Sequence, residues 1–198
     1  MDKQDSRAPI FIGVVGQISA GKGVLVDYLK DELDFISFSL SSILHLELKK
    51  REVTNYTRKS LQDLGDELRK KEGNGVLAKM ALSYLKKQKD KRVVIEGIRN
   101  PGEIELLKKE PSFTLIGVKA YQTIRFKRLL KRAKPWDPKT YEDFIKVDKR
   151  DLGVGQDKSG QQVGRCLAYC DYVLTNNGGI EEFQNKVKRL MEKIFDSI

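Results

Sequence analysis

The residues of this sequence best suited to chemistry lie in one short segment near the N-terminus, "GVVGQISAGKGV", residues 13–24. Gly16, Gly21 and Lys22 match the glycine-rich loop that wraps phosphates, G-x-x-x-x-G-K. In such a loop, backbone N–H groups and a helix N-terminus face the phosphates, and the lysine adds a full positive charge. A turn that only tightened a strand-to-helix connection would not favour a cation at a helix start. The segment predicts a nucleotide site formed by Gly16, Ser19, Ala20, Gly21, Lys22, Gly23 and Val24.

The loop departs from the usual pattern at Gly23, where a serine or threonine hydroxyl normally holds Mg²⁺. Two interpretations stay open: a kinase that holds its metal differently, and a nucleotide site that has lost its chemistry. Mg²⁺ commonly keeps several waters and binds substrate phosphates, so one carboxylate can suffice. We expect ATP and Mg²⁺ as cofactors, with Glu96 as the metal ligand and Ser19 as a further candidate hydroxyl.

Short apolar segments alternate with amphipathic helical segments along the chain. The segments expected to be strands are 8–16, 35–40, 91–98, 112–120 and 170–175. Parallel strands need crossover connections, which helices supply, so this alternation favours a parallel sheet. We predict an α/β fold of the three-layer P-loop NTPase type, with a five-stranded parallel sheet and helices on both faces. Ligands bind such sheets beyond the carboxyl ends of the strands.

Composition narrows the setting of the protein. A chain of 198 residues suits a single domain. No apolar run approaches the roughly 20 residues that span a bilayer, and "MDKQDSRAPI" is not a secretory signal, so we expect a cytoplasmic protein without a membrane segment. The net charge of +10 suits nucleotide phosphates or nucleic acid. Nucleic acid is the less favoured partner, because neither a helix-turn-helix nor interleaved aromatic and basic strand residues are evident. The sequence does not predict an oligomeric state.

Several further segments carry a resemblance to a known group of enzymes. They are "VVIEGIRNPGEIELLKK" (93–109), "TIRFKRLLKR" (123–132), "TYEDFIKVDKRDLG" (140–153) and "CDYVLTNNGGIEEF" (170–183). Together with the phosphate loop, they resemble the adenylate kinase-like group, which includes nucleoside monophosphate kinases and dephospho-coenzyme A kinases. Adenylate kinases also carry glycine directly after the loop lysine, although Val24 stands where they have threonine. The nearest likeness is to small archaeal and bacterial proteins often labelled dephospho-coenzyme A kinase-like.

The resemblance implies roles for residues after the third and fifth strands. Glu96 would help to position Mg²⁺ or the acceptor, or else cap its loop or pair with Arg99. Arg99 and Asn100 would face the acceptor, and an arginine fork suits a phosphate. Asn176 and Asn177 would lie in the loop that contacts the purine, although Asn-Gly also forms turns without any ligand.

Arginines at helical spacing are the candidates for transition-state stabilisation. Arg125, Arg128 and Arg132 recur on one helix face, and Arg150 resembles a second lid arginine. In nucleotide kinases such arginines stabilise charge on the transferring phosphoryl group. The plain alternative for some of them is a solvated basic face. His45, the only histidine, sits among leucines, where a packing or surface role outweighs catalysis.

The acceptor is expected to bind between the second and third strands. The segment 58–73 is similar to phage deoxynucleoside monophosphate kinases, and Ser39, Arg58 and Arg69 are the candidate contacts. Dephospho-coenzyme A kinases usually have an aspartate soon after the second strand, and this region has only serines. We therefore expect a P-loop kinase that phosphorylates a nucleoside or deoxynucleoside monophosphate. A dephospho-coenzyme A kinase-like activity and a catalytically weak nucleotide-binding regulator remain alternatives.

The expected domain is residues 1–198 as one kinase domain. It would include a mobile acceptor-binding segment at about 39–75 and a lid segment at about 125–152.

Overall fold

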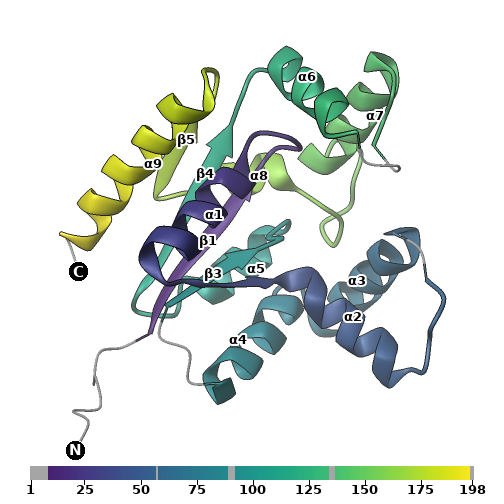
Figure 1. The fold of residues 1–198 in the computed structure, drawn as a ribbon. Coiled ribbons are helices and arrows are strands. Elements are labelled where there is room, and N and C mark those ends of the chain that lie inside the picture. The colour runs from purple at the N-terminus through teal and green to yellow at the C-terminus, as the bar shows by residue number, and fades with distance from the viewer. Residues whose placement is uncertain (1–8, 57, 89–91, 134–136, 197–198) are drawn as a thin grey trace, which may run out of the picture.

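The structure is a computed structural model that describes residues 9–56, 58–88, 92–133 and 137–196. Within these residues, five parallel strands form one sheet in the order β2-β3-β1-β4-β5 (Figure 1). The strands are β1 (Ile10–Gly16), β2 (Ile36–Ser39), β3 (Arg92–Glu96), β4 (Phe113–Lys119) and β5 (Tyr172–Thr175). The helices are α1 (Lys22–Leu33), α2 (Leu40–Lys50), α3 (Arg58–Glu72), α4 (Val76–Gln88), α5 (Pro101–Leu107), α6 (Gln122–Arg132), α7 (Tyr141–Leu152), α8 (Val163–Leu167) and α9 (Ile180–Phe195).

The central strand β1 divides two hydrophobic cores. Its side chains alternate between the faces of the sheet, as the two-residue period of a strand requires. Ile12 and Val14 pack with residues of α1 and α9, whereas Phe11 and Val15 pack with residues of α2, α4, α5 and α8. Helices therefore cover both faces, which confirms the predicted three-layer α/β fold.

The strand order gathers the candidate site residues at one edge. Parallel strands end at the same edge of a sheet, so the residues that follow β1, β3, β4 and β5 meet there. Gly16 pairs in register with Val118 of β4, and Ser39 of β2 pairs with Glu96 of β3. The phosphate loop thus lies at the middle of this edge.

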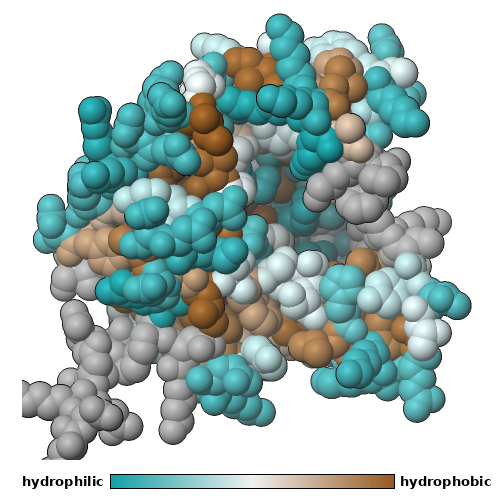
Figure 2. All heavy atoms as spheres, viewed as in Figure 1, coloured by the Kyte–Doolittle hydropathy of each residue, from teal (hydrophilic) through white to brown (hydrophobic). Residues whose placement is uncertain are grey.

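Two pairs of helices flank this edge. The pair α2–α3 extends on one side and α6–α7 on the other, and the molecular surface is hollowed between them (Figures 1 and 2). The segments predicted to be mobile, 39–75 and 125–152, correspond to these helix pairs, and their mobility stays a prediction. Within the described residues, no helix is long and apolar enough to cross a membrane.

Candidate nucleotide-binding site

The loop between β1 and α1 depends on glycine at both ends. A Cβ on Gly16 would lie 2.1 Å from the carbonyl oxygen of Val118, because β4 runs directly alongside. Gly21 has φ 104°, a conformation that side chains rarely adopt, and a Cβ there would lie 2.2 Å from Nδ2 of Asn176. These two glycines are therefore required by the geometry of the loop, as the motif predicts.

Lys22 lies at the centre of the candidate site. Its Nζ donates to the carbonyl oxygens of Gly16 at 2.7 Å and Gln17 at 2.9 Å. The pKa of Lys22 is lowered to about 8, mainly by burial and also by the nearby charges of Arg99 and Arg132, while Asp151 and Glu96 oppose the shift. All four charged groups therefore lie near enough to the lysine to influence it electrostatically. At neutral pH the ammonium remains charged, and it is held by weak partners that a phosphate can replace.

The start of α1 leaves polar groups for a ligand. No side chain caps this helix end, whose first N–H groups lack intrahelical acceptors. Ser19 has φ 56°, and its Oγ is the only buried side-chain polar atom without a hydrogen-bond partner among the described residues. At Gly23, nothing lies within 4 Å of the place where a Cβ would stand. The departure from the usual motif is therefore not imposed by crowding.

Glu96 supplies a carboxylate at the end of β3. Ser37 Oγ donates to its Oε1 at 2.5 Å, and its charge acts on Lys22. In the described part of the chain, no group of three or more histidine, cysteine, aspartate or glutamate side chains could hold a metal ion. One carboxylate beside a phosphate loop fits Mg²⁺, which binds through few protein oxygens and keeps its waters.

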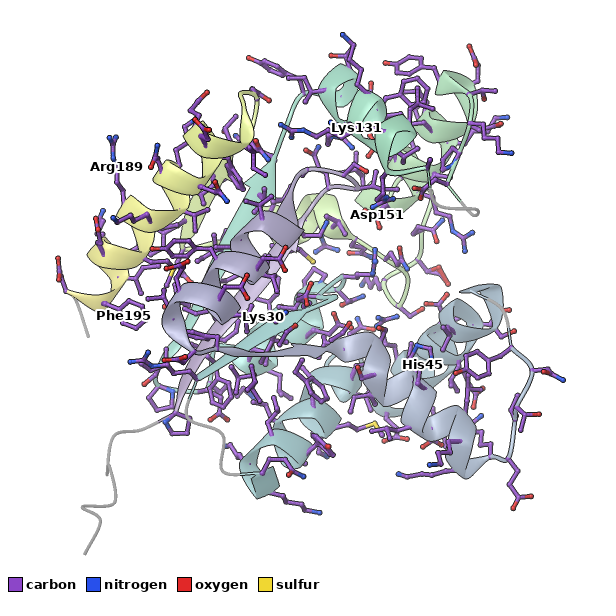
Figure 3. The ribbon with its side chains drawn as sticks, in the orientation of Figure 1. Lys30, His45, Lys131, Asp151, Arg189 and Phe195 are labelled. Atoms are coloured by element: carbon purple, nitrogen blue, oxygen red, sulfur yellow. The ribbon has the colours of Figure 1, made fainter. Side chains whose placement is uncertain are left out.

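Arg99 and Asn100 follow Glu96 and have different roles. The NH1 of Arg99 lies 2.5 Å from Oδ1 of Asp151, on the side of α7 that faces the loop (Figure 3). Asn100 is buried and caps α5 by accepting from the Gly102 N–H, while its Nδ2 donates to the carbonyls of Lys158 and Gly160. Arg99 thus belongs to the group around Lys22, whereas Asn100 holds two loops together.

The arginines predicted to act from a lid lie in different environments. Arg125 is 2% exposed, forms two bonds with Asp148, and donates to the carbonyl of Ile18 in the phosphate loop at 3.3 Å. Arg132 is paired with Asp137 but remains 39% exposed. Among these arginines, only Arg132 combines exposure with an influence on the pKa of Lys22. Arg150, also exposed, helps to lower the pKa of Asp66 on α3, although burial raises that pKa overall.

The loop after β5 is connected directly to the phosphate loop. Asn176 Nδ2 donates to the carbonyl of Ala20, and Arg128 donates to the backbone carbonyl and Oδ1 of Asn176. Asn177 Oδ1 accepts from the backbone N–H of Tyr121. Asn176 therefore shapes the site through the loop backbone, which places the predicted purine-contacting residues beside the phosphate loop.

The predicted acceptor contacts are separated in the structure. Ser39 lies at the end of β2, with its Oγ 2.9 Å from that of Ser41. Arg69 is buried, and its Nε, NH1 and NH2 already donate to Glu103 and Asp66. Arg69 therefore connects α3 to α5. Arg58 begins α3, but its side chain lies outside the described residues.

Sequence reasoning missed the acidic partners that hold these arginines. Asp148 and Asp151 lie three residues apart on α7 and bind Arg125 and Arg99, while Glu103 on α5 binds Arg69. A spacing of three places two residues on the same helix face. The segment "VDKRDLG" therefore contained that signal, but it did not show which arginines the carboxylates would meet.

Comparison with known proteins finds relatives along nearly the whole chain. No family model matches the sequence. A UPF0200 protein of Methanothermobacter thermautotrophicus is 30% identical over 189 residues, which cover 93% of this chain and 90% of that protein. The chain belongs to the UPF0200 family. A second member, from Sulfurisphaera tokodaii, is 32% identical over 183 residues, covering 92% of this chain and 96% of its own length.

Solved structures share the fold at low identity. TT1252 from Thermus thermophilus has a TM-score of 0.61 and 18% identity, with 94% of this chain and 98% of that chain covered. Shikimate kinase from Acinetobacter baumannii, solved in complex with shikimate, has a TM-score of 0.56 and 14% identity, with 96% and 94% covered. At these identities the likeness concerns the fold, which is that of a P-loop kinase.

Proposed function

We propose that this UPF0200 protein transfers a phosphoryl group from ATP to the phosphate of a nucleoside or deoxynucleoside monophosphate. The observation that carries the proposal is the environment of Lys22. The lysine lies at the junction of the phosphate loop and α1, and Glu96, Arg99, Arg132 and Asp151 are close enough to shift its pKa. Phosphoryl transfer needs mainly such positioning and electrostatic stabilisation.

The phosphate loop and Lys22 would hold the donor. The Lys22 ammonium, charged at neutral pH because its pKa is about 8, would exchange two loop carbonyls for phosphate oxygens. The uncapped N–H groups of α1 would bind the same phosphates. The loop around Asn176 would border the base, because Asn176 and Arg128 connect it to the loop backbone.

Glu96 would hold Mg²⁺ at the end of β3. When bound, the metal neutralises charge on the donor phosphates. Ser37 Oγ donates to one oxygen of the carboxylate, Oε1, at 2.5 Å, and so helps to orient it. The residues proposed to act on the transferring group itself are Lys22 and Arg132, because the Arg132 charge is near enough to lower the pKa of Lys22.

The acceptor phosphate would lie near Arg99, between the helix pairs α2–α3 and α6–α7. Arg99 is half-buried and anchored by Asp151, so its guanidinium is oriented before a ligand arrives. A phosphate acceptor needs no strong general base, unlike a hydroxyl acceptor. The carboxylates near Lys22 already have partners, since Asp151 pairs with Arg99 and Glu96 accepts from Ser37. This arrangement favours a monophosphate.

The test is an acceptor screen with a matched inactive variant. The purified protein is incubated with ATP, Mg²⁺ and, one at a time, each ribo- and deoxynucleoside monophosphate, dephospho-coenzyme A and shikimate, and the ADP formed is measured. We expect turnover with one or a few monophosphates that Lys22→Ala abolishes. Turnover with dephospho-coenzyme A or shikimate alone would refute the acceptor class. ATP binding with no transfer to any acceptor would favour a regulatory nucleotide-binding protein instead.

A further inference from the structure

A second concave site lies on the opposite side of α2 from its packed face. It encloses about 870 Å³ and is bordered by β2, α2, the chain after α2, and the end of α4. That volume is within the usual range for small-molecule sites, roughly 300–1,000 Å³. We call it the α2–α4 groove, defined by Phe38, His45, Lys49, Tyr56, Tyr84 and Gln88. None of these residues belongs to the group around Lys22.

The groove extends toward the sheet edge opposite the phosphate loop. Ile36, the first residue of β2, and Gln88, the last residue of α4, both border it. The phosphate loop follows the last residue of β1, at the carboxyl edge. His45 marks the groove on the exposed side of α2 (Figure 3). Phe38 and Ser42, near the carboxyl end of β2, border its other end, so the groove lies along β2 and α2 rather than at the phosphate loop.

The end of α2 builds one wall of the groove. Val53 N–H donates to the carbonyl of Leu48 and Glu52 N–H to that of Lys49, and Glu52 has φ 58°, which together form a Schellman turn. The turn sends the chain back along the outer face of α2. As a result, Tyr56 Oη lies 2.8 Å from His45 Nδ1, and the two rings are 5.4 Å apart.

The opposite wall is also aromatic. The rings of Phe38 and Tyr84 lie 5.5 Å apart, and Tyr84 is 42% exposed. Three more large apolar side chains at the groove are exposed, although such side chains are usually buried: Ile36, Leu46 and Val53. A surface of this kind, with rings on two walls, fits a flat ring that can stack.

The polar groups of the groove define the rest of the ligand. Within the described part of the chain, the side chains of Lys49, Thr54 and Gln88 have no hydrogen bond or ion pair, nor does Glu52. The Gln88 amide and the Thr54 hydroxyl can bind ring heteroatoms, and the Glu52 carboxylate can accept from an exocyclic amine. Lys49 supplies an unpaired cation in a chain of net charge +10, which favours an anionic group on the ligand.

We propose that the α2–α4 groove binds a small planar heteroaromatic compound that carries an anionic group, such as a nucleotide. The ring stacks on Tyr84 and Tyr56, the Gln88 amide and Glu52 carboxylate bind its edge, and Lys49 binds the anion. This site is separate from the phosphate loop and does not depend on the proposed kinase activity.

The test uses 2-aminopurine riboside 5′-monophosphate, whose fluorescence is quenched when its ring stacks. Titrations compare the unchanged groove with Tyr84→Ala and Tyr84→Phe, all in a background that carries both Lys22→Ala and Arg99→Ala, so that neither the phosphate loop nor the proposed acceptor site contributes. We expect Tyr84→Ala to weaken binding about tenfold, as loss of base stacking does. Tyr84→Phe keeps the ring, so its affinity should stay within about twofold of wild type.

A second comparison isolates the anion contact. Lys49→Gln should weaken the monophosphate several-fold while leaving 2-aminopurine riboside, which lacks the phosphate, unchanged. Unaltered binding by Tyr84→Ala, or absence of binding in the doubly substituted background, would overturn the proposal. The proposal would also be overturned if a single-stranded oligonucleotide containing 2-aminopurine bound at least about tenfold more tightly than the mononucleotide.

Discussion

The two sides of the phosphate loop use arginine in different ways. On the α2–α3 side, Arg69 is buried against Glu103 and connects two helices. On the α6–α7 side, Arg125 is buried against Asp148 but also donates to the loop carbonyl of Ile18, while Arg132 remains exposed. Buried pairs fix the framework, and the α6–α7 side adds a direct connection to the loop and an arginine that a phosphate can reach. Under the proposed function, the α6–α7 side is therefore the one expected to act on ATP.

The largest effect expected from this contrast is the loss of kcat when Arg132 is replaced. Arg132→Ala should lower kcat about a thousandfold, because loss of a transition-state arginine has that effect in phosphoryl transfer. Its exposed pair with Asp137 contributes little to stability, so the unfolding midpoint should stay close to that of wild type. Lys131→Ala, a neighbouring exposed cation on the same helix, is the control (Figure 3). Equal losses in the two variants would show only a diffuse effect of charge.

Breaking the buried ion pairs should lower the unfolding free energy on both the α2–α3 and the α6–α7 side. Only on the α6–α7 side should it also raise the KM for ATP. Asp148→Asn leaves a buried guanidinium without its counter-ion, so the unfolding free energy measured by denaturant should fall by about 3–5 kcal/mol. Glu103→Gln leaves a buried guanidinium with only its longer contact to an acid on α3, so the same free energy should fall there by about 1–3 kcal/mol. Glu142→Gln, an exposed acid on α7, should leave it unchanged. Only Asp148→Asn should also raise the KM for ATP, through Arg125 and Ile18. A higher KM for ATP in Glu103→Gln would remove the contrast.

The pKa of Lys22 predicts a specific dependence on pH. Because burial lowers that pKa to about 8, the free protein keeps its ammonium below pH 8 and loses it above. The ratio kcat/KM for ATP should be level below pH 8 and fall by about tenfold per pH unit well above it. Arginine stays protonated throughout this range, so whatever activity Lys22→Arg retains should not show the fall. A fall that persists in this variant would belong to another group.

The smallest expected effect concerns Gly23, the open one of the two glycines beside Lys22. Because nothing occupies the space beside Gly23, Gly23→Ala and Gly23→Ser should both fold and gain about 0.5 kcal/mol of stability from their better helix propensity. Only Gly23→Ser places a hydroxyl where the usual motif has one, so it alone should tighten Mg²⁺ binding to the ATP complex several-fold. Equal Mg²⁺ affinity in both variants would show that this hydroxyl position is not near the metal. Gly21→Ala should instead fail to bind ATP.

Sequence patterns predicted the fold because each pattern is local. The run "IFIGVVG" specifies a buried strand, and the glycines and lysine that follow it specify the loop without reference to any distant residue. The alternation of such strands with helices then leaves few topologies. The five-stranded parallel sheet and the position of Lys22 at its edge are confirmed on these grounds.

The environments of the arginines could not be predicted in the same way. Helical spacing places Arg125 and Arg132 on one face, but burial of the first depends on Asp148, which lies 23 residues further along the chain. Likewise, the burial of Arg69 depends on Glu103, 34 residues away. Such pairs are set by how the helices pack, so the pattern shows that arginines are present but not which of them remain open to a ligand. The α2–α4 groove was missed for the same reason, since its walls come from four separate segments.

The most direct measurement is a single-turnover assay with ATP labelled in the γ-phosphate, excess protein, Mg²⁺ and a mixture of nucleoside monophosphates, with the products separated by chromatography. We expect the label to appear in a nucleoside diphosphate, and this product to be absent with Lys22→Ala. Label that appears only as free phosphate, or that stays in ATP while ATP remains bound, would contradict phosphoryl transfer to a monophosphate.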